Sequence, residues 1–260
     1  MKKREGERQK LALLTNKCYR TINAMNGIPN QAEILVYVNC MEEIKLRTAA
    51  VNMFFKVASG NLYRISAVEF VSLQIRKILE LIALASLASH KEEFAKQHQK
   101  FAEMWRARKI LKDLEKLNPG FYPVPTEQVR DPQTGSVLQT RNVSKPFLTK
   151  QDFERVYQDC SAALHAQNPF GPQVDILRIE SEFPSWMERI QNLLNHHQVQ
   201  LLNSKHQLWI LMQASSDGRV HASLMQKIED PARVKLLDDE RSKRANLSSS
   251  AKSIDSEQTK

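Results

Sequence analysis

The chain has 260 residues, of which 42% are hydrophobic and 26% charged, so it holds enough apolar material for one sizeable core. Only 7 glycines and 10 prolines occur, and so few breakers favour long helices over many short strands. Three widely spaced cysteines argue against a disulfide framework and against structural zinc. The most apolar stretch, residues 78–88, is too short to span a bilayer, and we expect a cytoplasmic protein without a signal peptide.

The formal net charge is +9, and much of it lies at the start of the chain. Residues 1–20 contain seven Lys and Arg against two Glu, a net charge of +5. A basic start of this kind suits a nucleic acid or another anionic surface. A terminus that only improves solubility explains it equally well.

Apolar residues recur every three or four positions in the first half of the chain and predict four helices. The first covers residues 6–25 and the second runs from about 31 to 59. The third, residues 66–89, is apolar nearly all round and belongs at the centre of a bundle. The fourth covers residues 92–117. The apolar stripe of the first helix consists of Leu11, Leu14, Cys18, Ile22 and Met25.

Residues 118–147 differ in composition from the helices on either side. Prolines 123 and 125 favour extended backbone, and residues 131–135 have the composition of a tight turn. The flanks, residues 127–130 and 136–141, are predicted to pair as a small hairpin inserted between helices.

The second half predicts two more helices and a second hairpin. Thr149 to Asp152 has the pattern of a helix cap and opens the fifth helix, and the sixth runs from about 184 to 203. Asp217-Gly218 lies between two apolar runs, residues 207–214 and 219–227, which predicts a hairpin.

Together these elements predict a mainly α protein, a helical bundle with a small β-hairpin insertion and a C-terminal β-hairpin. The boundaries that we expect are a basic N-terminal helix in 1–30, the bundle in 31–203 with its insertion at about 118–147, the hairpin in 204–229, and a disordered tail in 230–260.

Two acids and an arginine lie on one stripe of the third helix. Glu69, Arg76 and Glu80 alternate there with Leu73 and Leu87 at spacings of three and four. Buried charges require partners, so an internal ion network that fixes the helix register is one interpretation. A functional pocket is the other.

The fifth helix carries a complementary polar line. Tyr157, Ser161 and His165 lie four residues apart. If this line faces the third helix, Arg76 would bind a phosphate group, His165 would act as general acid or base, and Glu80 would orient one of them. Ser161 completes this candidate catalytic set. A hydrogen-bonded histidine near a helix end is the simpler explanation for His165.

The second half of the fourth helix is basic. Arg106, Arg108, Lys109 and Lys112 follow Trp105, a combination that suits binding to a nucleic-acid backbone. A solvated helix face is the alternative.

Two features carry a resemblance to a known family: the third helix with Glu69, Arg76 and Glu80, and a later helix ending in residues 160–165. In these features the sequence resembles the HEPN superfamily, in particular its abortive-infection-type bacterial members. The resemblance covers about residues 31–166. It implies a helical bundle, metal-independent ribonuclease activity in phage defence or a toxin–antitoxin system, and a homodimer or a cognate protein partner.

Ribonucleases of that superfamily have an Arg and a following His with four to six residues between them, and here only Arg189 and His196 have that spacing, with six residues between. Both fall in the predicted sixth helix, outside the resembling segment. Arg76 and His165 would have to converge from separate helices instead.

The sequence therefore indicates a HEPN-like protein that acts on RNA and is a candidate metal-independent endoribonuclease, with no cofactor and no metal. Two alternatives stay open. One is a non-catalytic helical module that binds another protein, and the other is a nucleic-acid binder without catalysis.

Overall fold

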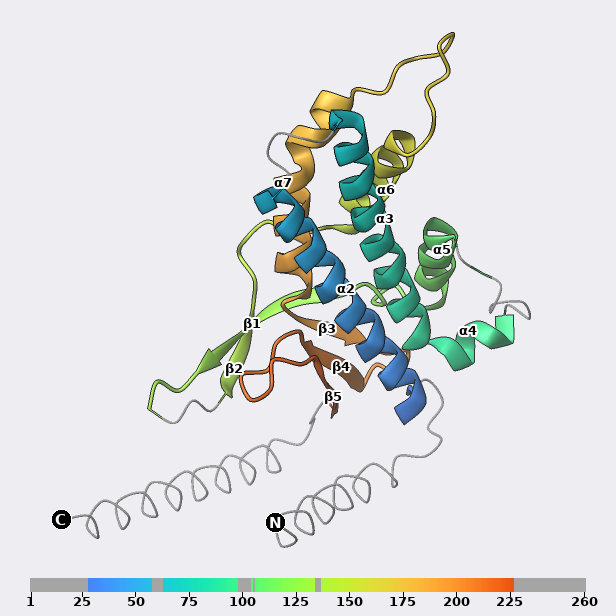
Figure 1. Ribbon diagram of the computed structural model, residues 1–260. Coiled ribbons are helices and arrows are strands. Elements are labelled where there is room, and N and C mark those ends of the chain that lie inside the picture. Colours follow the sequence, from blue (N-terminus) through green and yellow to red (C-terminus); the bar gives the residue numbers. More distant parts are fainter. Residues whose placement is uncertain (1–27, 58–62, 98–103, 105, 134–136, 227–260) are drawn as a thin grey trace, which may run out of the picture. The chain divides into compact units, whose positions relative to one another are not determined.

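The computed structural model describes residues 28–57, 63–97, 104, 106–133 and 137–226. The described part is mainly helical, with a hairpin inserted between helices and a second hairpin near the end of the described chain, as the sequence predicts (Figure 1). The predicted helix at 6–25 and the predicted disordered tail at 230–260 lie outside the described residues. The helices are α2 Gln31–Val57, α3 Arg64–Ala88, α4 Lys91–Gln97, α5 Ala107–Leu117, α6 Lys150–Ala163 and α7 Ile176–Leu194.

Helix α3 is the centre of the helical part, because it contacts α2, α4, α5, α6 and α7. Its buried side chains come from most of its circumference, as its sequence predicts for a central helix. Apolar side chains from α2 complete one side of this core, among them Tyr37, Met41 and Ile44. No helix in the described part is both long and apolar enough to cross a bilayer.

The prediction of one helix over 92–117 is wrong. Helix α4 ends at Gln97, Met104 and Arg106 are not helical, and α5 begins at Ala107. Arg106 has the extended backbone of an N-cap residue, with ψ of 98°. The interruption lets α5 lie against both α3 and α4 and bury its apolar stripe, which consists of Ala107, Ile110, Leu111 and Leu114.

The predicted bounds of the sixth helix are also wrong. Helix α7 begins eight residues before Pro184, with the Asp175 side chain accepting a hydrogen bond from the backbone of Arg178 at 3.0 Å. Proline lies within the helix rather than at its start. The helix ends at Leu194, and the following residues form a strand instead of two further turns.

This strand joins the two predicted hairpins into one sheet with the order β2-β1-β3-β4-β5. Strand β3 pairs antiparallel with β1, where Val124 faces Gln198, and with β4, where His197 faces Ile210. The turn before β5 contains Gly218 with a φ of 68°, a left-handed backbone that glycine adopts at no steric cost. The strands are β1 Val124–Arg130, β2 Val137–Asn142, β3 His196–Gln200, β4 His206–Leu211 and β5 His221–Gln226.

The described chain divides into two compact units. The first contains all the helices, with residues up to Glu127 and then Asn142–Met225. The second contains the outer part of the inserted hairpin, Gln128–Arg141. Every residue discussed below as part of a functional site belongs to the first unit.

Candidate nucleic-acid interface

Two of the predicted catalytic residues form a cluster with Tyr157. Arg76 Nε donates to Glu80 Oε1 at 3.3 Å, and the Tyr157 hydroxyl donates to the same oxygen at 3.3 Å. The Arg76 guanidinium lies over the Tyr157 ring, with Cζ 5.3 Å from the ring centroid. The side chain of Arg76 is 24% exposed and that of Glu80 14%, so water reaches the guanidinium although its neighbours hold it in place.

The first two members of the predicted stripe are not core residues, because Glu69 and Leu73 are exposed, whereas Leu87 at its other end is buried. Lys77, next to Arg76 on α3, bonds to Glu80 Oε2 at 3.0 Å. The carboxylate of Glu80 therefore sits between two cations. The arrangement is an ion network, as the first interpretation of the stripe expects, and it leaves Arg76 partly open to solvent.

The other two predicted catalytic residues do not join this cluster. Ser161 uses its hydroxyl to donate to the Tyr157 backbone oxygen at 2.6 Å, one turn back on the same helix. His165 is exposed and lies beyond the end of α6. Eight residues separate it from Tyr157, about 12 Å along a helix axis, whereas proton transfer needs contacts of about 3 Å.

The Arg189 and His196 pair is also separated, because the two residues lie on different elements. Arg189 on α7 bonds to Asp152 at 3.1 Å. His196 begins β3, is buried, and its Nδ1 lies 2.7 Å from Thr126 Oγ1. Their spacing in the sequence therefore does not bring Arg189 and His196 together in one site.

Three of the predicted nucleic-acid-binding residues lie on the outer side of α5, and the fourth, Arg106, directly precedes it. Arg106, Arg108, Lys109 and Lys112 are all exposed, opposite the buried apolar stripe of the helix. Residues 106–117 contain five Lys and Arg against two Asp and Glu, a net charge of +3. Within the described part of the chain, Lys109 and Lys112 have no ion-pair partner. Trp105 lies outside the described residues.

Helix α6 connects this basic side of α5 with the Arg76 cluster. With the Gln158 amide oriented so that its oxygen faces α5, both terminal nitrogens of Arg108 lie 3.2 Å from that oxygen. Lys150 at the start of α6 also pairs with Glu115 of α5. Consecutive residues of α6, Tyr157 and Gln158, thus contact Arg76 on one neighbouring helix and Arg108 on the other. We call the partly exposed Arg76 together with the exposed Lys77, Arg108 and Lys112 the α3–α5–α6 basic surface.

The buried histidines were missed as a group by the sequence analysis, which assigned His197 to a helix. His197 Nδ1 lies 2.8 Å from the Leu194 carbonyl oxygen and must donate to it, so Nε2 accepts from the Tyr37 hydroxyl at 2.8 Å. Burial lowers the pKa of His197 to about 4. Burial raises the pKa of the Tyr37 hydroxyl. Both groups are fully enclosed and neutral, which makes this a structural contact between α2 and β3.

A second buried histidine connects α3 to the loop after α5. His90 Nδ1 lies 2.9 Å from the Ser86 carbonyl oxygen, and Nε2 accepts from the Asn118 amide at 2.7 Å. That amide also donates to the Gln200 backbone oxygen at 2.7 Å. Burial lowers the pKa of His90. The sequence carries no signal for these roles, because polar residues flank both histidines: Ser89 and Lys91 beside His90, and His196 and Gln198 beside His197.

The described residues contain no group of three His, Cys, Asp or Glu side chains placed to hold a metal ion. Cys160 is buried, and burial raises the pKa of its thiol to about 12, so it is a packing residue and not a nucleophile.

Comparisons of the chain with protein-family models, curated proteins and solved structures found no match. The resemblance to the HEPN superfamily thus remains a prediction from a few residues.

Proposed function

We propose that this protein binds RNA through the α3–α5–α6 basic surface. The observation that carries the proposal is the placement of Arg76 and Arg108 on either side of the Tyr157-Gln158 step of α6. Both guanidinium groups are oriented by a neighbouring side chain yet face solvent, and Lys112 adds a charge without an ion-pair partner in the described part of the chain. Oriented arginines beside mobile lysines suit a row of phosphate groups.

A polyanion fits this surface better than a membrane does. A helix that binds a bilayer surface presents apolar side chains beside its basic ones. The apolar side chains of α5 are buried against the protein, or partly buried in the case of Leu117, so its exposed side offers charge alone. The choice of RNA among polyanions rests on the resemblance to the HEPN superfamily.

The proposal is limited to binding. Cleavage as the sequence suggests would need His165 beside the phosphate held by Arg76, and His165 lies about two helical turns along the chain from Tyr157, which contacts Arg76. Glu80 already accepts hydrogen bonds from Arg76, Lys77 and Tyr157, which disfavours it as a proton acceptor for a substrate.

Fluorescence anisotropy with a labelled single-stranded RNA at low salt tests the proposal. The variant is Arg108→Glu with Lys112→Glu, and the matched control is Lys56→Glu with Lys145→Glu, which changes the net charge equally at exposed positions away from the surface. We expect the first pair to weaken binding at least roughly tenfold more than the control, because it removes local phosphate contacts.

Equal losses in the two pairs would show that net charge alone governs binding and would reject the surface. A wild-type protein that fails to bind RNA at low salt would reject the function itself. Gels of the same RNA after incubation with wild type and with His165→Ala report separately on cleavage.

A further inference from the structure

The loop between α6 and α7 carries the most exposed large apolar side chain among the described residues. Phe170 lies in this loop and is 96% exposed, and Figure 1 shows the loop extending beyond the ends of the two helices. Residues 165–174 contain no Lys, Arg, Asp or Glu. Single exposed apolar residues are common on protein surfaces, so the way in which the loop holds this ring decides its meaning.

Hydrogen bonds within the loop fix the turn that presents the ring. The Asn168 side-chain oxygen accepts from the Phe170 N–H at 3.0 Å, and the Asn168 carbonyl oxygen accepts from the Gly171 N–H at 3.1 Å. The Gln173 amide donates to the carbonyl oxygens of Asn168 and Gly171, at 3.1 and 3.3 Å. The prolines on either side of this Phe-Gly pair restrict the backbone further. The ring is thus held out by an ordered turn, so a ligand that contacts it orders little additional chain.

The base of the loop is fixed to the helical core. Arg178 at the start of α7 donates to both carboxylate oxygens of Asp159 on α6, at 3.1 and 2.8 Å. This ion pair connects the two helices that the loop joins. Asp159 directly follows Gln158, the residue of α6 that contacts Arg108.

Helix α5 runs antiparallel to α6, so its basic start lies toward the end of α6 where the loop begins. Lys150 at the start of α6 pairs with Glu115 near the end of α5. Gln158, near the end of α6, contacts Arg108 near the start of α5. From Gln158 to Ala163, the last residue of α6, is about 8 Å along the helix axis. The loop therefore begins beside one end of the α3–α5–α6 basic surface.

We propose that Phe170 stacks on an unpaired base of RNA bound to this surface, which makes single-stranded RNA the preferred ligand. The inference rests on the proposed RNA binding. Proteins that bind single strands combine cations that contact the phosphate groups with aromatic rings on which bases stack. The bases of a duplex are already stacked on one another, so the ring finds a free base only in a single strand.

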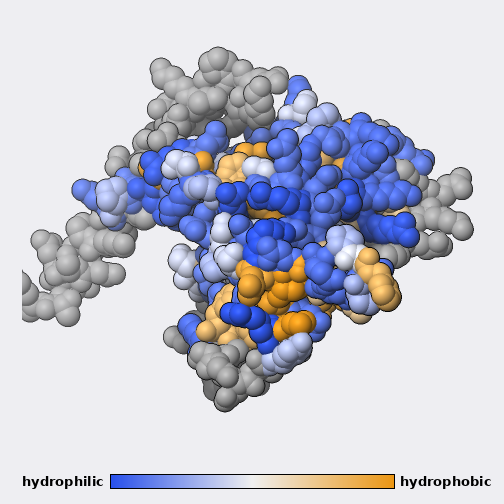
Figure 2. Space-filling view, turned by 90° about the horizontal axis from the view of Figure 1, so that it is seen from above, coloured by the Kyte–Doolittle hydropathy of each residue, from blue (hydrophilic) through white to orange (hydrophobic). Residues whose placement is uncertain are grey.

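The surroundings of the ring favour a base over a protein partner. Figure 2, which views the molecule from the end where the loop extends, shows a mostly hydrophilic face with hydrophobic residues gathered in a patch. The exposed apolar side chains near the starts of α3 and α7 include Ile65 and Leu177. Because Phe170 is almost fully exposed, it does not pack against them. A protein partner would bury the ring among further apolar side chains, as in the core of an interface, whereas a base requires one free ring.

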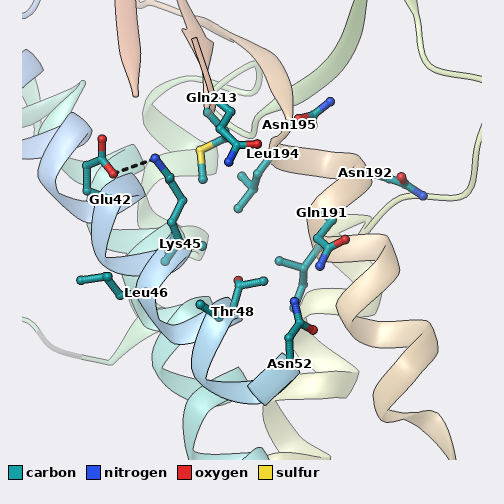
Figure 3. A pocket seen from close by; sticks show the side chains of 14 residues that line it. Glu42, Lys45, Leu46, Thr48, Asn52, Gln191, Asn192, Leu194, Asn195 and Gln213 are labelled. Atoms are coloured by element: carbon teal, nitrogen blue, oxygen red, sulfur yellow. Dashed lines mark ion pairs between the residues drawn. The ribbon is translucent and has the colours of Figure 1, made fainter. Parts of the chain in front are cut away.

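A groove between α2 and α7 lacks the features of a base-binding site. It encloses about 710 Å³, and none of the described residues that line it is aromatic (Figure 3). Its cation, Lys45, lies 3.0 Å from the Glu42 carboxylate and donates to the Gly218 carbonyl oxygen at 2.7 Å. The groove therefore offers a base no ring to stack on, and its charge is already paired.

Fluorescence anisotropy at low salt with a single-stranded RNA and with an RNA duplex of the same length tests the stacking. We expect Phe170→Ala to weaken binding of the single strand at least roughly fivefold and to leave binding of the duplex unchanged. Phe170→Trp keeps an aromatic ring and should bind the single strand at least as tightly as wild type. The matched control is Leu177→Ala, which removes another exposed apolar side chain and should bind both ligands like wild type.

Equal affinity of wild type and Phe170→Ala for the single strand would overturn the stacking, and the proposed function would stand if Arg108→Glu with Lys112→Glu still weakens binding. Equal losses of single-strand and duplex affinity in Phe170→Ala would also overturn it. Self-association that Phe170→Ala abolishes without a loss of RNA affinity would assign the ring to a contact between copies of the chain instead. A wild-type protein that binds neither RNA would reject the proposed function, and the stacking with it.

Discussion

At the residue scale, the most consequential polar contacts are those that hold β3 against the helices. The Tyr37 hydroxyl and the His197 imidazole meet inside the core, and Asn118 bonds both to His90 and to the backbone of β3. A buried polar group that loses its partner costs about 1–3 kcal/mol. These contacts therefore specify how the sheet is placed on the helical core.

The buried His197 gives folding stability a defined pH dependence. Its pKa is about 4 in the folded chain, against about 6.5 when it is unfolded and in water. As the pH falls from about 6.5 toward 4, the unfolded chain binds a proton here that the folded chain does not, so stability decreases. The contribution is fully present above pH ~6.5, and its total loss is on the order of 3 kcal/mol.

We predict that His197→Gln flattens the pH dependence of the unfolding free energy between about pH 6.5 and 5. The slope attributable to one proton is about 1.4 kcal/mol per pH unit. Urea unfolding at several pH values measures it, and His165→Gln at an exposed position is the control, with an unchanged slope expected. An NMR titration showing the wild-type imidazole protonating near pH 6.5 would contradict the prediction.

At the element scale, α6 connects the two halves of the proposed surface, and its start is defined by a capping box. The Thr149 hydroxyl accepts from the Asp152 backbone at 3.1 Å, and the Asp152 carboxylate accepts from the Thr149 backbone at 3.3 Å. The sequence pattern predicted this helix start correctly, because the interaction is confined to four consecutive residues.

We expect Thr149→Ala to lower the free energy of unfolding by about 1 kcal/mol, since one backbone N–H of α6 loses its acceptor. Thr149→Ser keeps the hydroxyl and should remain close to wild type. The midpoint of urea unfolding measures both, with Ser144→Ala at an exposed loop position as the control. If the serine variant is destabilised as much as the alanine variant, the hydroxyl is not the cause.

Elements that depend on distant contacts were harder to predict than α6. The apolar spacing of α7 continues through His197 and Leu201, so no pattern in the sequence marks the end of the helix at Leu194. Strand β3 contains His and Gln residues of low strand preference, and its conformation comes from pairing with β1 and β4. Local periodicity does not encode partners that lie 70 residues away or that follow later in the chain.

In the candidate site too, contacts within one helix could be predicted from the sequence, and contacts between helices could not. The spacing of Arg76 and Glu80 follows from the helix period, so their contact was expected once α3 was assigned. Their meeting with Tyr157 required knowing which side of α6 faces α3, and the sequence left that open. The position of His165 depended on where α6 ends, and helix ends are poorly fixed by a pattern of apolar residues.

At the scale of the whole molecule, positive charge occurs in two separate places. Residues 1–20 have a net charge of +5 and residues 106–117 a net charge of +3, within a chain total of +9. Any affinity for RNA has to be divided between them. The start of the chain would attract RNA at long range, and the α3–α5–α6 basic surface would contact it locally. RNA affinity is expected to respond differently to substitutions in the two.

A double-mutant cycle separates the two contributions. We predict that Lys2→Gln, Lys3→Gln and Arg4→Gln together weaken RNA binding at low salt, and that Arg108→Glu with Lys112→Glu weakens it further by the same factor in either background. Independent sites add in free energy to within about 0.5 kcal/mol. The glutamate pair should also lower the slope of log affinity against log salt concentration by about two phosphate contacts. If the glutamate pair has no effect once the N-terminal charges are removed, the start of the chain carries the binding and α5 is only a solvated helix.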